Sequence, residues 1–346
     1  MVSFEHGNGH AHLVSWGARY AVLFAGEAHA ALIRAALPGS TVTVTNRADF
    51  LLETAKPDAV AFVDSDLFHL IDGVTTNAPI VAIIDDTLSS SLTKTIRSLE
   101  SSPWLSHVIV ASLLSNPMAR SHLTSLLDLL PHGPDQSMVG GPGIGRVALL
   151  ARASRRGARF DRMREFFSKH ELSHRTIATI TEVAEELVTN ALYDAPVEAG
   201  YFEHAIPRTE DVELPLDRAC EISYGIEYGD AFVRVRDTFG ALKRDRLLEV
   251  LNRCNASSVA LDESRGGAGL GMWRVFSTAT TLSIAVIPDR VTDIRIGFAT
   301  KDGRIGKQLL AVHLFFAREP AVSEAPAAPH VDRELDDDSV TLMRFI

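Results

Sequence analysis

Three groups of residues in the second half of the chain have the types and spacing of a nucleotide site. Glu186 and Asn190 stand four positions apart, so a helix would carry the acid and the amide on one face. Asp237 ends an apolar run, and Gly240 follows three positions later. The glycine-rich segment 266–271 runs directly into a helical pattern. A carboxylate and a carboxamide suit a metal–phosphate assembly, an aspartate can accept a hydrogen bond from an exocyclic amine, and glycines at a helix start expose N–H groups to phosphate.

Each group also has an ordinary structural explanation when it is taken alone. An acid and an amide four residues apart can form an exposed polar pair on a surface helix. An Asp-x-x-Gly sequence is common in turns, and a glycine run is often a flexible loop. A dinucleotide-binding interpretation of the glycines is disfavoured because no strand immediately precedes them. The interpretation therefore depends on the combination and its order.

Apolar periodicity predicts the elements that must position these groups. Helices are expected at 160–170, 174–192 and 242–254. Strands are expected at 219–226, 231–236, 281–287, 293–300 and 309–316, with Tyr228-Gly229-Asp230 as a hairpin signal between the first two. The second helix would carry Glu186 and Asn190 beside its buried stripe, and the second strand would end at Asp237.

In this order and context, the three groups resemble the GHKL (Bergerat-fold) ATPases, which include histidine kinases, gyrase, Hsp90 chaperones and anti-sigma-factor serine kinases. The resemblance covers about residues 158–318 and implies an α+β ATPase sandwich. The anti-sigma kinase branch fits best, because Glu186-Leu-Val-Thr-Asn190-Ala lies in a helix straight after a short amphipathic helix. No helical hairpin with a phosphoacceptor histidine precedes it.

The resemblance implies that the chain binds ATP together with Mg²⁺. Asn190 would be the Mg²⁺ ligand that bridges the phosphates, and Glu186 would be the general base. Asp237 would bind the adenine amine, with Gly240 beside the ring. The segment 241–265 would be a lid over the nucleotide. The remaining residues assigned to the nucleotide site are Gly267, Gly269, Leu270, Gly271 and Asp194, the last at a position where the branch often has histidine.

The first 130 residues alternate short apolar runs with helical spacing. Strands are expected at 20–25, 41–45, 59–63, 79–84 and 107–111. This pattern predicts an α/β domain with a five-stranded parallel sheet of the flavodoxin type, covered by helices on both faces.

The segment 18–130 resembles the receiver domain of bacterial two-component regulators. Asp64 falls where that family carries its phosphoacceptor aspartate. Two departures affect this site: Glu27 is the only acid after the first strand, and Asn116 replaces the lysine after the fifth. An aspartyl phosphate needs cations to neutralise its charge, so a degenerate receiver that serves docking or dimerisation is favoured over phosphorylation of Asp64.

We therefore expect five segments: a flexible terminus at 1–17, the receiver-like domain at 18–130, a Gly- and Pro-rich linker at 131–157, the ATP-binding domain at 158–318 and an acidic tail at 319–346. The stretch 147–164 is basic and compatible with a helix. The apolar end of the tail has three open interpretations: a docking peptide, an extra edge strand or an unstructured segment.

Composition narrows the class of protein. Of 346 residues, 46% are hydrophobic and 23% charged, which is typical of a globular chain with a sizeable core. The net charge of −10 argues against nonspecific binding to nucleic acid. No uncharged apolar run is long enough for a membrane span, and no secretory leader is evident. Two cysteines suit a reducing cytoplasm.

These observations predict a cytoplasmic bacterial signalling protein that binds Mg·ATP and phosphorylates Ser or Thr on a partner protein, such as a regulator in a sigma-factor pathway. A homodimer is compatible with this hypothesis. One alternative is a scaffold that binds ATP without turning it over and changes partners through its lid. Another is a degenerate histidine kinase that uses Asp64 in a phosphorelay.

Overall fold

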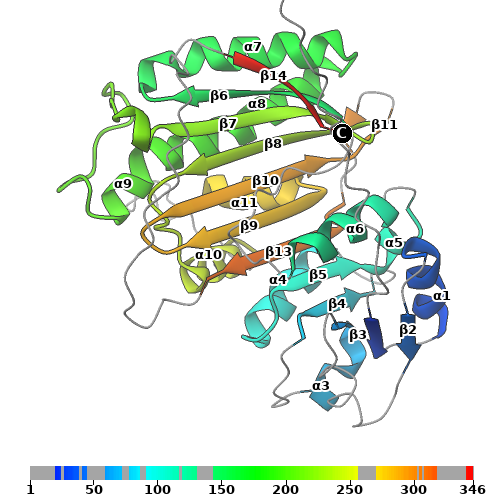
Figure 1. Cartoon of the computed structure of the whole chain (residues 1–346). Coiled ribbons are helices and arrows are strands. Elements are labelled where there is room, and N and C mark those ends of the chain that lie inside the picture. Colours follow the sequence, from blue (N-terminus) through cyan, green and yellow to red (C-terminus); the bar gives the residue numbers. More distant parts are fainter. Residues whose placement is uncertain are drawn as a thin grey trace, which may run out of the picture.

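A computed structural model describes residues 20–24, 27–38, 41–44, 59–71, 78–85, 91–116, 119–130, 143–255, 270–301, 304–305, 308–317 and 340–345. Their main feature is a mixed, twelve-stranded sheet with the order β14-β6-β7-β8-β10-β9-β13-β5-β4-β3-β1-β2 (Figure 1). The predicted α/β class is confirmed at this level. None of the described helices is long and apolar enough to cross a membrane.

The N-terminal part of the sheet is parallel, as predicted. Its strands are β1 (Tyr20–Phe24), β2 (Thr41–Val44), β3 (Ala59–Asp64), β4 (Ile80–Ile84) and β5 (His107–Val110). They pair in the order 2-1-3-4-5, the order of a doubly wound flavodoxin-like sheet. The helices of this part are α1 (Glu27–Ala36), α3 (Phe68–Ile71), α4 (Ser91–Ser101), α5 (Ala111–Leu114) and α6 (Ala119–Leu129).

The C-terminal part of the sheet is mostly antiparallel. Its strands are β6 (Gly143–Leu150), β7 (Cys220–Glu227), β8 (Asp230–Asp237), β9 (Thr281–Ile287), β10 (Val291–Phe298) and β13 (Ala311–Phe316). The predicted hairpin joins β7 to β8, and Tyr228 and Gly229 both have positive φ at its turn. Such a turn matches the twist of the two strands. A small separate ladder pairs β11 (Thr300–Lys301) with β12 (Arg304–Ile305).

Helices pack against the C-terminal part of the sheet and form one hydrophobic core with it. They are α7 (Arg156–Lys169), α8 (His174–Thr189), α10 (Arg244–Asn255) and α11 (Leu270–Thr278). Phe167, Ile180 and Phe276 from these helices are buried together with Tyr224 and Val233 from the strands. Figure 1 shows α8 and α11 behind the strands that they cover. This packing buries the apolar stripe of α8. The polar residues next to this stripe, among them Glu186, lie along the edge where the helix meets the sheet.

The two predicted domains share one sheet because β13 pairs with β5. The pairing is antiparallel and contains three residue pairs, of which His313 opposite His107 is one. A second contact joins α10 to α4: the Arg244 guanidinium donates hydrogen bonds to the carbonyl oxygens of Leu99 and Leu105, at 3.1 and 2.8 Å. Asn252 on α10 also donates to Glu100 Oε1 at 2.6 Å.

The structure corrects the prediction for the segment between the two domains. Residues 143–150 form β6, inside the predicted linker, and a helix begins only at Arg156 instead of at residue 147. Ala148 and Leu150 are buried in alternation, the period of a strand, but the arginines on either side conceal it. Arg159 in this basic stretch is buried, and it donates to the Leu149 carbonyl oxygen at 3.3 Å.

The end of the chain supplies an edge strand, which confirms one of the open interpretations. Strand β14 (Val340–Phe345) pairs with β6 in antiparallel register, from Val340 opposite Ala148 to Phe345 opposite Gly143. The acidic part of the predicted tail, 319–339, lies outside the described residues, as does the predicted flexible terminus 1–17.

Candidate functional site

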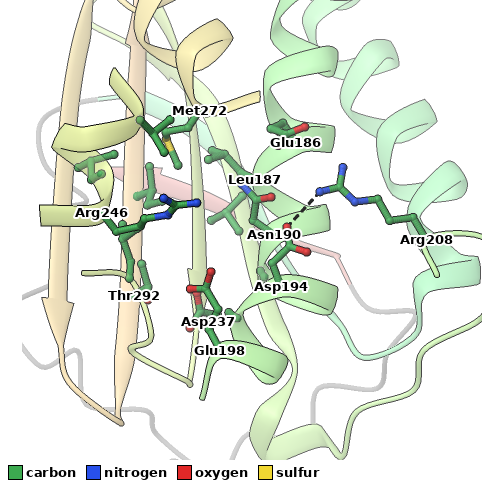
Figure 2. A pocket seen from close by; sticks show the side chains of 17 residues that line it. Glu186, Leu187, Asn190, Asp194, Glu198, Arg208, Asp237, Arg246, Met272 and Thr292 are labelled. Carbon is green, nitrogen blue, oxygen red and sulfur yellow. Dashed lines mark hydrogen bonds and ion pairs between the residues drawn. The ribbon is translucent and has the colours of Figure 1, made fainter. Parts of the chain in front are cut away.

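A cleft lies between the α8 side and the α10–α11 side of the helical layer, over strands β8 and β10 (Figure 2). It has an empty volume of about 920 Å³, including its open mouth. Four of the predicted site residues line it: Glu186, Asn190, Asp194 and Asp237. The structure thus brings together a helix face and a strand end that are nearly fifty residues apart in the chain. Apolar side chains such as Leu187, Val235 and Ile294 line the rest.

Asp237 ends β8 in a buried position on the sheet side of the cleft. Its Oδ1 accepts hydrogen bonds from the backbone N–H groups of Phe239 at 2.9 Å and Gly240 at 3.3 Å. Burial raises the Asp237 pKa from 3.8 to about 6, although these hydrogen bonds oppose the shift. Thr292 on β10 is paired with Asp237 across the ladder and also lines the cleft. Hydrogen bonds from Thr292 also lower the Asp237 pKa. Because Oδ1 already accepts from two backbone groups, Oδ2 has the greater remaining capacity to accept from a ligand amine.

Asn190 opens a π-helical turn, Asn190–Asp194, directly after α8. Such turns are rare and are frequent at functional sites. With its amide nitrogen turned toward the neighbouring acids, Asn190 donates to Glu186 Oε1 at 3.3 Å and to Asp194 Oδ2 at 2.9 Å. The amide oxygen is then left for another partner, and oxygen is the ligand type that Mg²⁺ prefers.

Four carboxylates line the cleft, and each has a raised pKa because burial disfavours its charged form. They are Glu186, Asp194, Glu198 and Asp237. The charge of Asp194 raises the Glu186 pKa further, whereas Arg208 lowers it. A cleft with this many desolvated acids favours a ligand that brings cations or hydrogen-bond donors.

Gly271 in the first turn of α11 lies against the Glu186 carboxylate. A Cβ at this position would come within 1.8 Å of Glu186 Cδ and Oε1. Only glycine therefore allows α11 to approach Glu186 at this distance. Leu270 is the first residue of α11. The predicted phosphate-binding residues Gly267 and Gly269 lie outside the described residues, as does the part of the predicted lid from residue 256 onward.

Gly240 has a structural role that differs from the predicted one. It does not line the cleft; its φ is +62°, and a Cβ would lie 2.1 Å from the carbonyl oxygen of Ile287 and 2.8 Å from the Asp289 amide nitrogen. Both atoms belong to the backbone of the turn between β9 and β10. The glycine thus lets the loop after β8 pack against this turn, rather than against a ligand ring.

We expect Gly240→Ala to lower the free energy of unfolding by about 2–4 kcal/mol, since it adds both backbone strain and a clash with backbone atoms. Gly200→Ala is a matched control, because Gly200 also has a positive φ, +72°, but a Cβ there would meet nothing within 4 Å. Chemical denaturation of both variants measures the difference. Equal losses of stability would contradict the packing role of Gly240.

Further cleft residues were not predicted from the sequence. They are Glu198, Arg208, Arg246, Met272 and Thr292. Glu198 continues the four-residue spacing of Glu186, Asn190 and Asp194, so periodicity could have found it. Thr292 depends on the register of β10 against β8. Arg208 comes from the segment between α9 (Ala195–Glu198) and β7, and nothing in its local sequence indicates the cleft.

The structure places Asp64 at the end of β3, as predicted, with a partner from α1. Its Oδ1 lies 2.7 Å from His29 Nδ1, and both side chains are partly buried. Glu27, the single acid after the first strand, begins α1, and residues 25 and 26 before it lie outside the described residues. His29 thus contributes a hydrogen-bonding group to Asp64 that the sequence pattern did not predict.

In the part of the chain that the structure describes, no group of three or more His, Cys, Asp and Glu residues is arranged to hold a metal ion. The Asn190 oxygen can still serve a cation that receives its other ligands from phosphate oxygens and water, which is the usual mode for Mg²⁺.

No family model matches the chain, and neither the curated proteins nor the solved structures contain a match to it.

Proposed function

We propose that the cleft binds Mg·ATP and that the protein transfers the terminal phosphoryl group to a Ser or Thr of a partner protein. The observation that carries this proposal is that Asp237, Asn190 and Glu186 line one cleft. A buried acceptor for an exocyclic amine, an amide oxygen for a cation and a partly buried base are then available to one ligand. Thr292 lies beside Asp237 and adds a hydroxyl at the adenine end of the cleft.

The arrangement of the chain supports a Bergerat-type assignment for this part. A mostly antiparallel sheet carries helices that pack into one core with it, and the cleft opens between those helices above the strands. The parallel sheet with order 2-1-3-4-5 supports a receiver-like origin for the N-terminal part. The proposed substrate is a cytoplasmic regulator protein, such as one that acts in a sigma-factor pathway.

The proposed reaction asks little covalent chemistry of the protein, because phosphoryl transfer depends mainly on positioning and charge stabilisation. The partner hydroxyl oxygen forms a bond to the γ-phosphorus, the bond between this phosphorus and the β–γ bridging oxygen breaks, and ADP leaves. The hydroxyl proton passes to the Glu186 carboxylate. Burial raises the Glu186 pKa, which makes this group a better proton acceptor. Bound Mg²⁺ would neutralise phosphate charge, and Asn190 is the residue that would hold it.

Calorimetry with a nonhydrolysable ATP analogue, with and without Mg²⁺, tests the site. We expect the wild-type protein to bind the analogue more tightly with Mg²⁺, because the Asn190 oxygen is a ligand only for the metal complex. Asn190→Ala should lose this increase. If Asn190→Ala shows the affinity of the wild type with Mg²⁺, the assignment of the cleft is wrong.

A second candidate function is a scaffold that is switched by ATP without turnover. One observation favours it: α10 has one face on the cleft and another on the N-terminal part. Arg246, Leu247 and Val250 line the cleft, whereas Arg244 and Asn252 hydrogen-bond to the α4 region. A nucleotide that moved α10 would thus alter this contact. An assay of ADP release and of label transfer to candidate partners separates the two, because a scaffold gives neither.

A further inference from the structure

The cleft has an excess of negative charge that any triphosphate must overcome. Four carboxylates line it, and among the described residues that line it only Arg208 and Arg246 are cationic. Carboxylates and phosphates are both negatively charged, and they repel each other strongly in a partly desolvated site. Arg246 is on α10 and has an acidic partner one helical turn away, since its Nη1 lies 2.8 Å from Glu249 Oε2. Arg208 comes from the opposite wall (Figure 2).

Arg208 is held at the cleft by an exposed ion pair. Its Nη2 lies 3.1 Å from Asp194 Oδ2, and both side chains are nearly half exposed, 47% and 45%. Exposed pairs of this kind contribute little stability, so the guanidinium can exchange partners at low cost. The same Asp194 oxygen can accept from Asn190, so Asp194 would keep a donor if Arg208 left.

The position of Arg208 assigns it to one end of a bound nucleotide. Arg208 lines the same cleft as Glu186, the proposed base, and Figure 2 shows both side chains on the same side of it. Through Asp194, Arg208 is also next to Asn190, the proposed ligand of the cation. In the proposed function these two residues serve the phosphates, whereas Asp237 serves the base. Arg208 is therefore nearest to the phosphate end of the cleft.

We propose that Arg208 moves from Asp194 to the terminal phosphate when ATP binds, so that the segment between α9 and β7 supplies a phosphate-binding arginine from the same chain. This inference rests on the proposed function and deepens it. The planar guanidinium can donate two parallel hydrogen bonds to phosphate oxygens, and it neutralises charge that grows in phosphoryl transfer. ADP lacks the group that Arg208 would contact, so the site would distinguish ATP from ADP through this residue.

Calorimetry of ADP and of a nonhydrolysable ATP analogue, both with Mg²⁺, tests the proposal on the full chain. We expect Arg208→Ala to lower the affinity for the ATP analogue roughly 10–100-fold, the loss expected for a hydrogen bond to a charged group. The affinity for ADP should stay nearly unchanged. Arg208→Lys should recover part of the loss, because lysine keeps the charge without the paired donors. Arg152→Ala is the matched control, since it removes another exposed ion pair, to Glu213, that does not line the cleft.

The outcomes separate this inference from the function on which it rests. If Arg208→Ala weakens ADP and the ATP analogue equally, or weakens neither, Arg208 does not contact the terminal phosphate and the inference is wrong. The proposed nucleotide site would survive either result. If the wild-type protein binds neither ligand, the nucleotide site and the inference both fail. Thermal unfolding of each variant checks that the fold is intact.

Discussion

Replacing Glu186 with glutamine is expected to lower the rate of phosphoryl transfer roughly 10²–10⁴-fold while ATP affinity stays nearly unchanged. Glutamine has the shape of glutamate and can still accept a hydrogen bond from Asn190, so the cleft keeps its form. It cannot accept the proton of the attacking hydroxyl. ADP release, measured at saturating Mg·ATP with and without candidate partner proteins, gives the rate, and calorimetry gives the affinity.

Gly271→Ala provides an independent way to disturb the same carboxylate. The new Cβ would occupy the present position of the Glu186 carboxyl group, which is the mobile end of a flexible side chain. We expect Glu186 to move aside at little cost in stability and the turnover rate to fall.

Full activity in Glu186→Gln would assign the base to another group. A loss of ATP affinity in Glu186→Gln as large as its loss of rate would instead assign Glu186 to nucleotide binding.

Replacing Asp237 with asparagine is expected to weaken ATP binding by at least about 100-fold, because a site built to pair with a ligand amine would then present a donor to it. The backbone N–H groups of Phe239 and Gly240 hold the oxygen at Oδ1 in both proteins. The amide nitrogen of asparagine must then take the place of Oδ2. The N–H groups of the introduced amide and of the adenine amine would then face each other, where the aspartate accepts from that amine.

The same geometry predicts a change in base preference. Inosine triphosphate carries a carbonyl oxygen where adenine has its amine, and the amide nitrogen of the introduced asparagine could donate to it. The ratio of inosine to adenine nucleotide affinity should therefore rise in Asp237→Asn. Competition calorimetry with the two triphosphates measures this ratio. If Asp237→Asn binds ATP as the wild type does, Asp237 does not recognise the base.

The stability of the Asp237→Asn variant relative to the wild type is also expected to rise between about pH 4 and about pH 6. The Asp237 pKa is raised from 3.8 to about 6, so the folded wild type binds more protons than the unfolded chain between these values. The stability of the wild type therefore falls as pH rises from about 4 to about 6, by at most about 3 kcal/mol from this group. Asparagine does not titrate.

Unfolding experiments across this pH window test the charge of Asp237 separately from its role in binding. The difference in unfolding free energy between Asp237→Asn and the wild type should grow from about pH 4 to about pH 6.5 and then stay constant. Glu186, Asp194 and Glu198 titrate in both proteins and cancel in the difference. A difference that does not vary with pH would mean that the Asp237 pKa is not raised.

Local sequence determined much of the secondary structure. Strands β1, β3, β4 and β5 are short, mainly apolar runs, and β2 consists of β-branched residues. The described side chains of β3, β4 and β5 are mostly buried because helices cover the sheet. The stripe of α8 follows three- and four-residue spacing, so Glu186 and Asn190 had to share a face. The sequence also predicted the turn at Tyr228 and Gly229 and the strands on either side of it. Each of these patterns depends on residues within a few positions of one another.

The tertiary structure decided the pairings over long distances. Strand β6 joins the C-terminal edge strand to β7, although its glycines and the Gly- and Pro-rich stretch before it resembled a linker. Gly240 meets the turn between β9 and β10, about fifty residues further along the chain. Strand β13 inserts between β9 and β5 and makes two predicted domains share one sheet. Local periodicity specifies which face of an element is apolar, but not which other element covers it.

The cleft combines both kinds of information. The sequence by itself determined that Glu186 and Asn190 lie on one face of a helix and that Asp237 ends a strand. Only the folded sheet, with β10 paired to β8, put Thr292 beside Asp237, and only the path of the segment after α9 brought Arg208 to Asp194. The physical reason is that helix and strand periods come from neighbouring residues, whereas a cleft is formed by side chains whose proximity depends on strand order, register and packing.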